Sequence, residues 1–399
     1  MEASDQAALA LLFIVAAAFL LPLVGDRVRV PAVVLEILFG VLIGPVFGLV
    51  EGAEFLDRLA ELGFFLLMFL AGFEIDVRTF SRRGRDQVLT GLLIFVLTMA
   101  GAWMAAELLG YGLFMAFVLA TTSVGLVVPT LRSTRRMQTR LGQTILVAAL
   151  LADFLTLLGV TVFALFEDRG SGSHLLAIPA FFAVAAAILL TLKWVVWWRP
   201  EWFGRLFEID DPEEIGTRAS LALMLVFVAV SIAFGIEKIL GAFLAGTVFA
   251  MVFRNRTALA RQLNGFSYGF LIPIFFINVG IHFDVDALGE PGAITGMLVL
   301  VGAAVAVKVF PALVLVIGRL TLREALAAGA LLSARLSLII AVAELGVRLE
   351  VIDRTVEASI IVLAAVTATL APIVFRLLAP SLGAAEAEGN GGARPSGGG

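Results

Sequence analysis

Two ionisable residues lie near the middle of long apolar segments of this chain. Asp153 is the only charged side chain in residues 141–166, and Lys308 is the only one in residues 291–318. Placing a carboxylate at the bilayer centre costs about 2.5–3.5 kcal/mol of insertion free energy. Such a residue is therefore rare in transmembrane segments unless it has a function. Two such groups of opposite sign indicate a pathway for ions or protons rather than an inert scaffold.

A carboxylate in this setting can hold either a proton or a cation, because both compete for the same oxygens. Burial favours the neutral carboxyl, whereas a nearby Lys308 ammonium favours the carboxylate. Hydroxyl oxygens would add the hard ligands that alkali cations prefer. The candidates are Thr156, one helical turn after Asp153, together with Thr122, Ser123 and Ser333. The competing interpretation is a structural ion pair between Asp153 and Lys308, which brings no guaranteed stability.

The composition places these groups in a membrane protein. The 399 residues are 61% hydrophobic and 15% charged, with a mean hydropathy of +1.05. Globular proteins in water carry about 25% charged residues. The chain has no cysteine, which excludes disulfides and thiolate metal sites, and its two histidines, His174 and His282, fall near expected helix ends. We expect no cofactor and no nucleic-acid partner.

Hydropathy and helix-breaking residues predict an all-α polytopic protein with thirteen transmembrane spans. The expected spans are 7–24, 30–50, 56–75, 87–109, 111–132, 141–166, 174–197, 216–235, 238–253, 265–283, 293–318, 323–346 and 355–379. Loops that follow odd-numbered spans are rich in arginine, whereas the others are short, acidic or sparsely basic. The positive-inside rule therefore predicts a cell-membrane protein with its N-terminus outside and its C-terminus in the cytoplasm.

The two halves of the chain resemble each other. LEILFGVLIGPVFG at 35–48 matches EKILGAFLAGTVFA at 237–250, and FFLLMFLAGFEIDV at 64–77 matches IPIFFINVGIHFDV at 272–285. The offset maps each span onto the seventh span after it, so corresponding helices cross the membrane in opposite directions. Such inverted repeats occur in secondary transporters, which bind substrate between the repeats. Chance similarity between apolar segments is the alternative.

The repeat also predicts where helices break. Span five contains ATTSVGLVVPT at 120–130, with Pro129 and small polar residues, and span twelve contains LLSARLSLII at 331–340. Proline interrupts a helix because it removes a backbone donor and crowds the preceding turn. Interrupted helices at corresponding positions of two halves indicate a transporter site, where free helix ends and carbonyl groups meet the ion.

These features predict one transporter unit over residues 1–380. Core helices would occupy about 86–166 and 293–379, scaffold and dimerisation helices about 7–76 and 216–284, and a linker helix about 174–197. Residues 381–399 form a glycine-rich tail that we expect to be disordered. The small-residue segments Gly40/Gly44 and Gly241/Gly246 could serve a dimer surface or ordinary packing within one chain.

Several segments resemble the bacterial cation:proton antiporters, a family that includes sodium/proton antiporters and the membrane portions of potassium-efflux systems. They are VVLEILFGVLIGP (33–45), FLAGFEIDV (69–77), TTSVGLVVPTLR (121–132) and IPIFFINVGIHFD (272–284). The resemblance extends over about residues 7–379. It implies a homodimer in the bilayer that exchanges sodium, or alternatively potassium, for protons by elevator-like alternating access.

The resemblance also assigns roles to residues. Asp153 matches the ion-binding aspartate of the family, Lys308 its basic partner, and Thr122 and Ser123 the first unwound crossover, while Ser333 lies in the second. One position departs from the paired-acid members, since Ala152 precedes Asp153. With one carboxylate fewer, we favour electroneutral exchange, in which Lys308 keeps its proton. No nucleotide-binding domain is expected, because the sequence ends soon after the last span.

Three other functions are compatible with a polytopic chain. A channel of the same fold would pass current with no proton stoichiometry, and a receptor would tolerate loss of the Asp153 charge. A membrane-embedded enzyme would need a nucleophile–base pair or a metal cluster near one face, and the sequence offers none.

Overall fold

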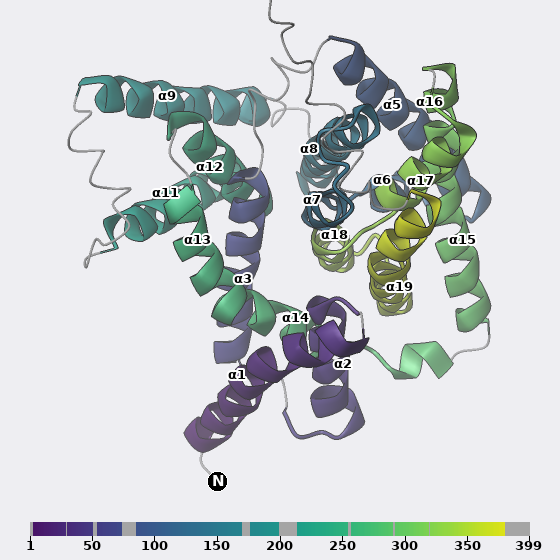
Figure 1. The fold of residues 1–399 in the computed structure, drawn as a ribbon. Helices are drawn as coiled ribbons and strands as arrows, with labels where there is room; N and C mark the ends of the chain where they lie inside the picture. The colour runs from purple at the N-terminus through teal and green to yellow at the C-terminus, as the bar shows by residue number, and fades with distance from the viewer. Residues whose placement is uncertain are drawn as a thin grey trace, which may run out of the picture.

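The computed structural model of the chain is helical throughout the part that it describes (Figure 1). It describes residues 3–28, 30–50, 54–73, 85–169, 176–198, 214–253, 257–289, 292–318 and 320–379. His174 and the glycine-rich tail lie outside these residues, so the expectations for them stay predictions. His282 follows the last turn of a helix and is half-exposed at 3.6 Å from Asp57, as expected of a residue at a helix end.

The helices of the first half include one that ends in a π-helical turn. They are α1 (Ala3–Val28), α2 (Ala32–Val41) with a π-helical turn at Leu42–Val46, α3 (Glu54–Phe73), α5 (Arg85–Leu108), α6 (Leu113–Ala120), α7 (Val124–Ser133), α8 (Arg140–Arg169) and α9 (Ala177–Trp198).

The second half follows a similar pattern. Its helices are α11 (Ile215–Phe234), α12 (Lys238–Val252), α13 (Thr257–Phe266) with a π-helical turn at Ser267–Leu271, α14 (Ile272–Ile281), a 3-10 turn at Asp286–Gly289, α15 (Ala293–Ala312), α16 (Val314–Ile317), α17 (Leu322–Leu332), α18 (Ser337–Arg348) and α19 (Arg354–Leu378).

Within the described residues, the helices overlap the spans expected from hydropathy, some of them as pairs of consecutive helices. Within the described residues, eight helical segments are long and apolar enough to cross a membrane, and three further apolar helices are shorter. A helix of about 20 residues spans the ~30 Å of hydrocarbon. The protein is therefore an all-α, multi-pass membrane protein.

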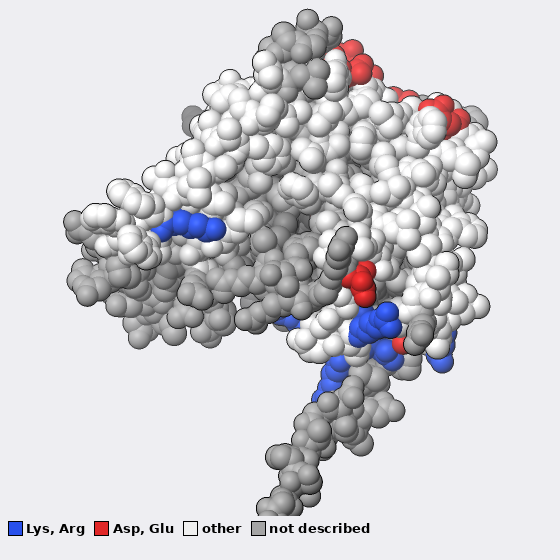
Figure 2. All heavy atoms as spheres, turned by 90° about the horizontal axis from the view of Figure 1, so that it is seen from above, with Lys and Arg blue, Asp and Glu red and all other residues white. Residues whose placement is uncertain are grey.

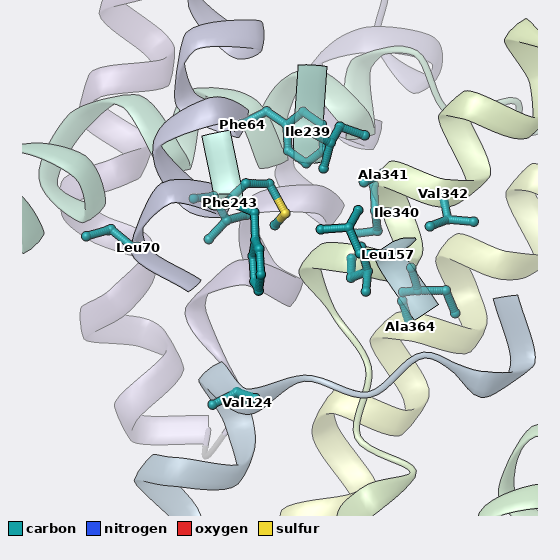
Figure 3. Packing of buried hydrophobic residues seen from close by; sticks show 14 of the residues in the cluster. Phe64, Leu70, Val124, Leu157, Ile239, Phe243, Ile340, Ala341, Val342 and Ala364 are labelled. Carbon is teal, nitrogen blue, oxygen red and sulfur yellow. The ribbon is translucent and has the colours of Figure 1, made fainter. Parts of the chain in front are cut away.

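The helices form two groups that lie side by side (Figure 1). The α3–α12 group holds α1–α3, α9 and α11–α14; the α8–α17 group holds α5–α8 and α15–α19. In Figure 3, Ile239 and Phe243 of α12 face Leu157, Ile340 and Ala341 of the other group across an apolar seam.

Glycines let the helices of the α3–α12 group approach closely. A Cβ at Gly72 of α3 would collide with the Phe243 carbonyl of α12, and one at Gly246 would collide with the carbonyl of Phe69. The same happens between α2 and α14, where Gly40 lies against the carbonyl of Ile277. Gly44 and Gly241 likewise meet atoms of the same chain. These contacts confirm packing within one chain as a role of the small-residue segments.

Charged groups are sparse over one broad face of the protein. In Figure 2 most of the described part of that face is uncharged, with acidic side chains at the upper right edge and most basic side chains towards the lower edge. A largely uncharged band between two charged edges suits a chain surrounded by lipid.

Candidate functional site

Two broken helices meet inside the α8–α17 group. The first break separates α6 from α7 at residues 121–123, where Thr121 and Ser123 adopt extended backbone conformations. The second separates α17 from α18 at residues 333–336. Threonine and serine side chains stabilise such breaks, since their hydroxyls compete with the helix for backbone partners. Both interruptions fall in the segments where the repeat predicted them.

The position of Pro129 relative to the first break differs from the expectation. Pro129 lies inside α7, five residues after its start, and the chain leaves the helix earlier, at Thr121. The assumption that proline interrupts this helix was wrong. The break is instead stabilised by side chains from other segments, which bind the backbone groups that it exposes.

Cationic side chains bind the exposed end of α6. Nζ of Lys308 donates to the carbonyl of Ala120 at 2.6 Å. Arg335 donates to the carbonyls of Leu119 and Thr121 at 2.6 and 3.1 Å. A helix leaves its last four carbonyls unpaired and carries a partial negative charge at this end. Two cations therefore replace the missing helix turn and hold the crossover open.

Thr122 connects the two breaks. Its hydroxyl accepts a hydrogen bond from Nζ of Lys308 at 2.7 Å and donates one to the carbonyl of Leu332, at the end of α17, at 3.2 Å. Thr122, from the first break, thus stabilises the end of α17, and Arg335, from the second break, stabilises the end of α6. The two crossovers are held as one unit by this reciprocal exchange of hydrogen bonds.

Asp153 belongs to α8, and its side chain lies against the first turn of α7. Its Oδ2 accepts a hydrogen bond of 3.2 Å from the backbone N–H of Val124, and the side chain is partly buried. The N-terminal end of a helix offers free N–H groups and partial positive charge, which stabilise an anion. The neighbouring Phe154 packs on Phe243 of α12 with ring centroids 6.2 Å apart, so the carboxylate lies close to the seam between the two groups.

The hydroxyl of Thr156 is an unsatisfied polar group one turn from Asp153. The side chain is fully buried, and its Oγ1 has no hydrogen-bond partner among the described residues. A buried hydroxyl without a partner carries a desolvation cost. A bound cation would use such an oxygen, together with the carboxylate, as a ligand.

The structure brings some of the predicted site residues together, whereas the hydroxyl of Ser333 bonds within its own helix. Lys308 and Thr122 contact each other directly, and Asp153 meets α7 immediately after Ser123. Ser333 lies in the second break, but its hydroxyl donates to the carbonyl of Ala330 in its own helix at 2.6 Å. Its proton is therefore committed to capping α17, and only its lone pairs are left for a cation.

The sequence suggested Arg335, two residues after Ser333, as a residue that orients the second crossover, but the candidate ion and proton ligands did not include it. The side chain is fully buried and makes a third hydrogen bond, to the carbonyl of Ala304 in α15, at 2.8 Å. An arginine within the apolar segment 331–340 is the sequence signal for it, by the same reasoning that identified Asp153. Lys308 is also almost fully buried, and both Arg335 and Asp153 act on it electrostatically. The site therefore combines two buried basic side chains with one carboxyl group.

Comparison with known proteins places the chain among transporters. The family model described as "Sodium/hydrogen exchanger, transmembrane" matches residues 14–379. YjbQ of Bacillus subtilis, named as a candidate Na(+)/H(+) antiporter, is 35% identical over 92% of this chain, which spans 62% of that protein. A candidate Na(+)/H(+) antiporter 3 of Methanocaldococcus jannaschii is 27% identical over 90% of this chain and 93% of its own length.

A solved structure shares the fold. The sodium proton antiporter MjNhaP1 from Methanocaldococcus jannaschii, at pH 8, superposes with a TM-score of 0.64 over 95% of this chain and 99% of that one. The two sequences are 14% identical, so the likeness concerns the fold.

Proposed function

Because this chain belongs to the sodium/hydrogen exchanger family, we propose that it exchanges a monovalent cation, with sodium as the favoured ion, for protons across the membrane. The observation that carries the proposal is the placement of Asp153 at the N-terminal end of a broken helix, beside the unsatisfied hydroxyl of Thr156. A carboxylate and an orphan hydroxyl at mid-span can bind a desolvated cation, and the carboxylate can also bind a proton.

The coupling follows from competition for one carboxylate. When a cation binds to Asp153 it displaces the proton, and when a proton binds it displaces the cation. Thr156 and the crossover oxygens of Thr122, Ser123 and Ser333 are the proposed further ligands. Since the site alternates between the two sides carrying one or the other, transport in one direction drives transport in the other.

Lys308 is proposed to keep its proton through the cycle. Its ammonium donates to the carbonyl of Ala120 and to the hydroxyl of Thr122, and these two acceptors, together with the Asp153 carboxylate, oppose the burial and the Arg335 guanidinium that disfavour the charged form. With alanine at position 152, Asp153 is the acidic group of the proposed ion site, and one cation there replaces one proton. Exchange is electroneutral in this scheme, and its rate is independent of the membrane potential.

Alternating access would come from movement of the α8–α17 group, as the transport core, against the α3–α12 group, as the scaffold. The seam between them is apolar, and Asp153 lies close to it. Reciprocal glycine contacts, of Gly72 with α12 and of Gly40 with α14, support inverted repeats, because α2 matches α12 and α3 matches α14 in sequence. We further propose a homodimer in the cell membrane, with the N-terminus outside and the C-terminus in the cytoplasm.

Potassium is the second candidate for the transported ion. A carboxylate, hydroxyls and backbone carbonyls can coordinate both sodium and potassium. Which ion the site prefers depends on the ion–oxygen distances when the site is occupied. Exchange measured against sodium, lithium and potassium chloride in turn identifies the preferred ion.

Reconstituted vesicles test the exchange. With a pH-sensitive dye inside and the membrane potential clamped, an outward cation gradient should drive proton entry in the wild type, and reversal of that gradient should drive proton exit. Asp153→Asn should abolish both signals while the protein still folds. Cation-dependent current without proton movement would instead identify a channel, and full exchange by Asp153→Asn would reject the proposal.

A further inference from the structure

A cavity of about 500 Å³ separates the two helix groups on one side of the protein. Its walls come from α3, α12 and α14 in one group and from α18 and α19 in the other. It opens beside the start of α12 and the end of α18, which lie on the outer side in the proposed orientation. Apolar residues that include Phe64, Phe275 and Ile340 line its deeper part.

A second cavity, of about 220 Å³, lies next to the first. It is lined by residues of α8, α18 and the segment before α12, so it too lies between the groups. Two residues line both cavities, Glu237 and Arg348. Nη2 of Arg348 lies 3.1 Å from Oε2 of Glu237. An ion pair therefore crosses between the two groups where open space lies on either side of it.

The helix ends favour this pair. Glu237 is the N-cap residue of α12, where partial positive charge stabilises a carboxylate, and Arg348 occupies the last turn of α18, where partial negative charge stabilises a cation. Each charge is fixed to a different group. A relative movement of the groups along the seam must lengthen or break the contact between them.

Two other ion pairs on the cavity wall each lie within one helix group. Lys238 pairs with Glu61 within the α3–α12 group, at 2.6 Å, and Arg354 pairs with Glu357 inside α19, at 2.8 Å. Movement of one group against the other leaves these pairs intact. Arg354 thus provides a matched control for Arg348, with the same charge on the same wall and, among the described residues, an ion pair that stays within α19.

We propose that the Glu237–Arg348 pair is a latch that stabilises the conformation with the outer cavity open, and that it separates in every transport cycle. This inference rests on the proposed alternating access of the two groups. The Arg348 side chain is 57% exposed and that of Glu237 is 20% exposed, so water screens the pair and its effect is small. Loss of the latch should shift the conformational equilibrium by roughly two- to fivefold.

The absence of native cysteine makes the shift measurable. Val279 lines the larger cavity from α14, and Val279→Cys would be the single thiol of the protein. A membrane-impermeant maleimide should label it from outside in proportion to the time the cavity is open. In this background, Arg348→Gln should slow labelling about two- to fivefold and Arg354→Gln should not. The charge-reversed pair Glu237→Lys with Arg348→Glu should restore the rate in part, because the contact returns but each charge then lies at the helix end that disfavours it.

A reversible cross-link tests whether the pair must separate. The two side chains meet at their ends, so their backbones are too distant for a direct disulfide. Glu237→Cys with Arg348→Cys, joined by a short bismethanethiosulfonate reagent, should lose exchange and regain it when reductant is added. The same reagent on Glu237→Cys alone is the control.

The outcomes separate the latch from the exchange itself. Equal labelling of the Arg348→Gln and Arg354→Gln proteins would overturn the latch, as would full exchange by the cross-linked protein. Neither result bears on cation-driven proton movement in the wild type or on its loss in Asp153→Asn. If exchange by the wild type is absent, the proposed function fails before the latch is considered.

Discussion

Thr122 and Lys308 form a 2.7 Å hydrogen bond that joins the first crossover to α15. The same threonine hydroxyl donates to the carbonyl of Leu332, so one side chain connects three segments that are distant in sequence. The consequence is that the broken ends of α6 and α17 are positioned by a shared network rather than by their own helices. Changes in this network should affect the site and the stability of the fold together.

Replacement of Thr122 by valine keeps the shape and removes both hydrogen bonds. The Leu332 carbonyl then lacks this donor and the Lys308 ammonium loses one of its two acceptors, a loss of about 1–3 kcal/mol. We expect Thr122→Val to lower the apparent melting temperature in detergent and to slow exchange. Thr122→Ser retains the hydroxyl and should stay close to the wild type. Equal behaviour of the two variants would show that the network is dispensable.

Arg335 should be the most sensitive basic residue for stability. Arg335→Ala leaves three buried carbonyls without their donor, at a cost of about 3–5 kcal/mol. Arg335→Lys keeps the charge but offers a single nitrogen in place of a planar fork, so it should recover stability only in part. Arg323→Ala is the control, because that exposed arginine donates to the carbonyl of Leu377 at the surface. Thermal unfolding followed by size-exclusion chromatography gives the ranking, and a stable Arg335→Ala protein would contradict it.

Thr156 should matter for ion binding and not for stability. Its hydroxyl has no partner among the described residues, so Thr156→Val removes a buried unsatisfied group and should leave the melting temperature unchanged or raised. If this oxygen binds the cation, the apparent KM for the cation should rise by about five- to tenfold. Thr156→Ser should retain the wild-type KM. A lower melting temperature with an unchanged KM would identify the hydroxyl as structural.

The α3–α12 contact gives a prediction about the scaffold. A methyl group at Gly72 would meet the carbonyl of Phe243, so Gly72→Ala should force the helices apart at a cost of about 1–3 kcal/mol. Gly101 lies in α5, where a methyl group would meet no atom within 4 Å, so Gly101→Ala should be neutral or slightly stabilising. Comparison of the two melting temperatures checks this, and equal values would argue against the close approach.

The helices could be predicted from sequence because lipid imposes a simple pattern. Apolar runs separated by charged loops coincide with the helices, and the two interruptions fall within 120–130 and 331–340 as the repeat indicated. The cause of the first interruption could not be read from local sequence. Pro129 is accommodated inside α7, and the break depends on Lys308 and Arg335, which reach it from more than 180 residues away.

The charged residues Asp153 and Lys308 could also be predicted from the sequence, whereas the groups that they bind could not. Asp153 and Lys308 are prominent because each is isolated in an apolar run. Asp153 is bound by the backbone N–H of Val124, and Lys308 donates to the backbone carbonyl of Ala120. Every residue has such backbone groups, so residue types could not identify these two partners. Ser333 illustrates the limit, because the residue lies in the expected break but its hydroxyl caps its own helix.

The most direct test of the account is the number of protons released when a cation binds to the purified protein. In weakly buffered solutions over a range of pH, sodium chloride should release up to one proton for each cation bound by the wild type, reaching one where Asp153 is protonated beforehand, whereas choline chloride should release none at any pH. Asp153→Asn should neither bind the cation nor release the proton. Cation binding by the wild type without proton release, or an unchanged release by Asp153→Asn, would contradict a single carboxylate shared by both ions.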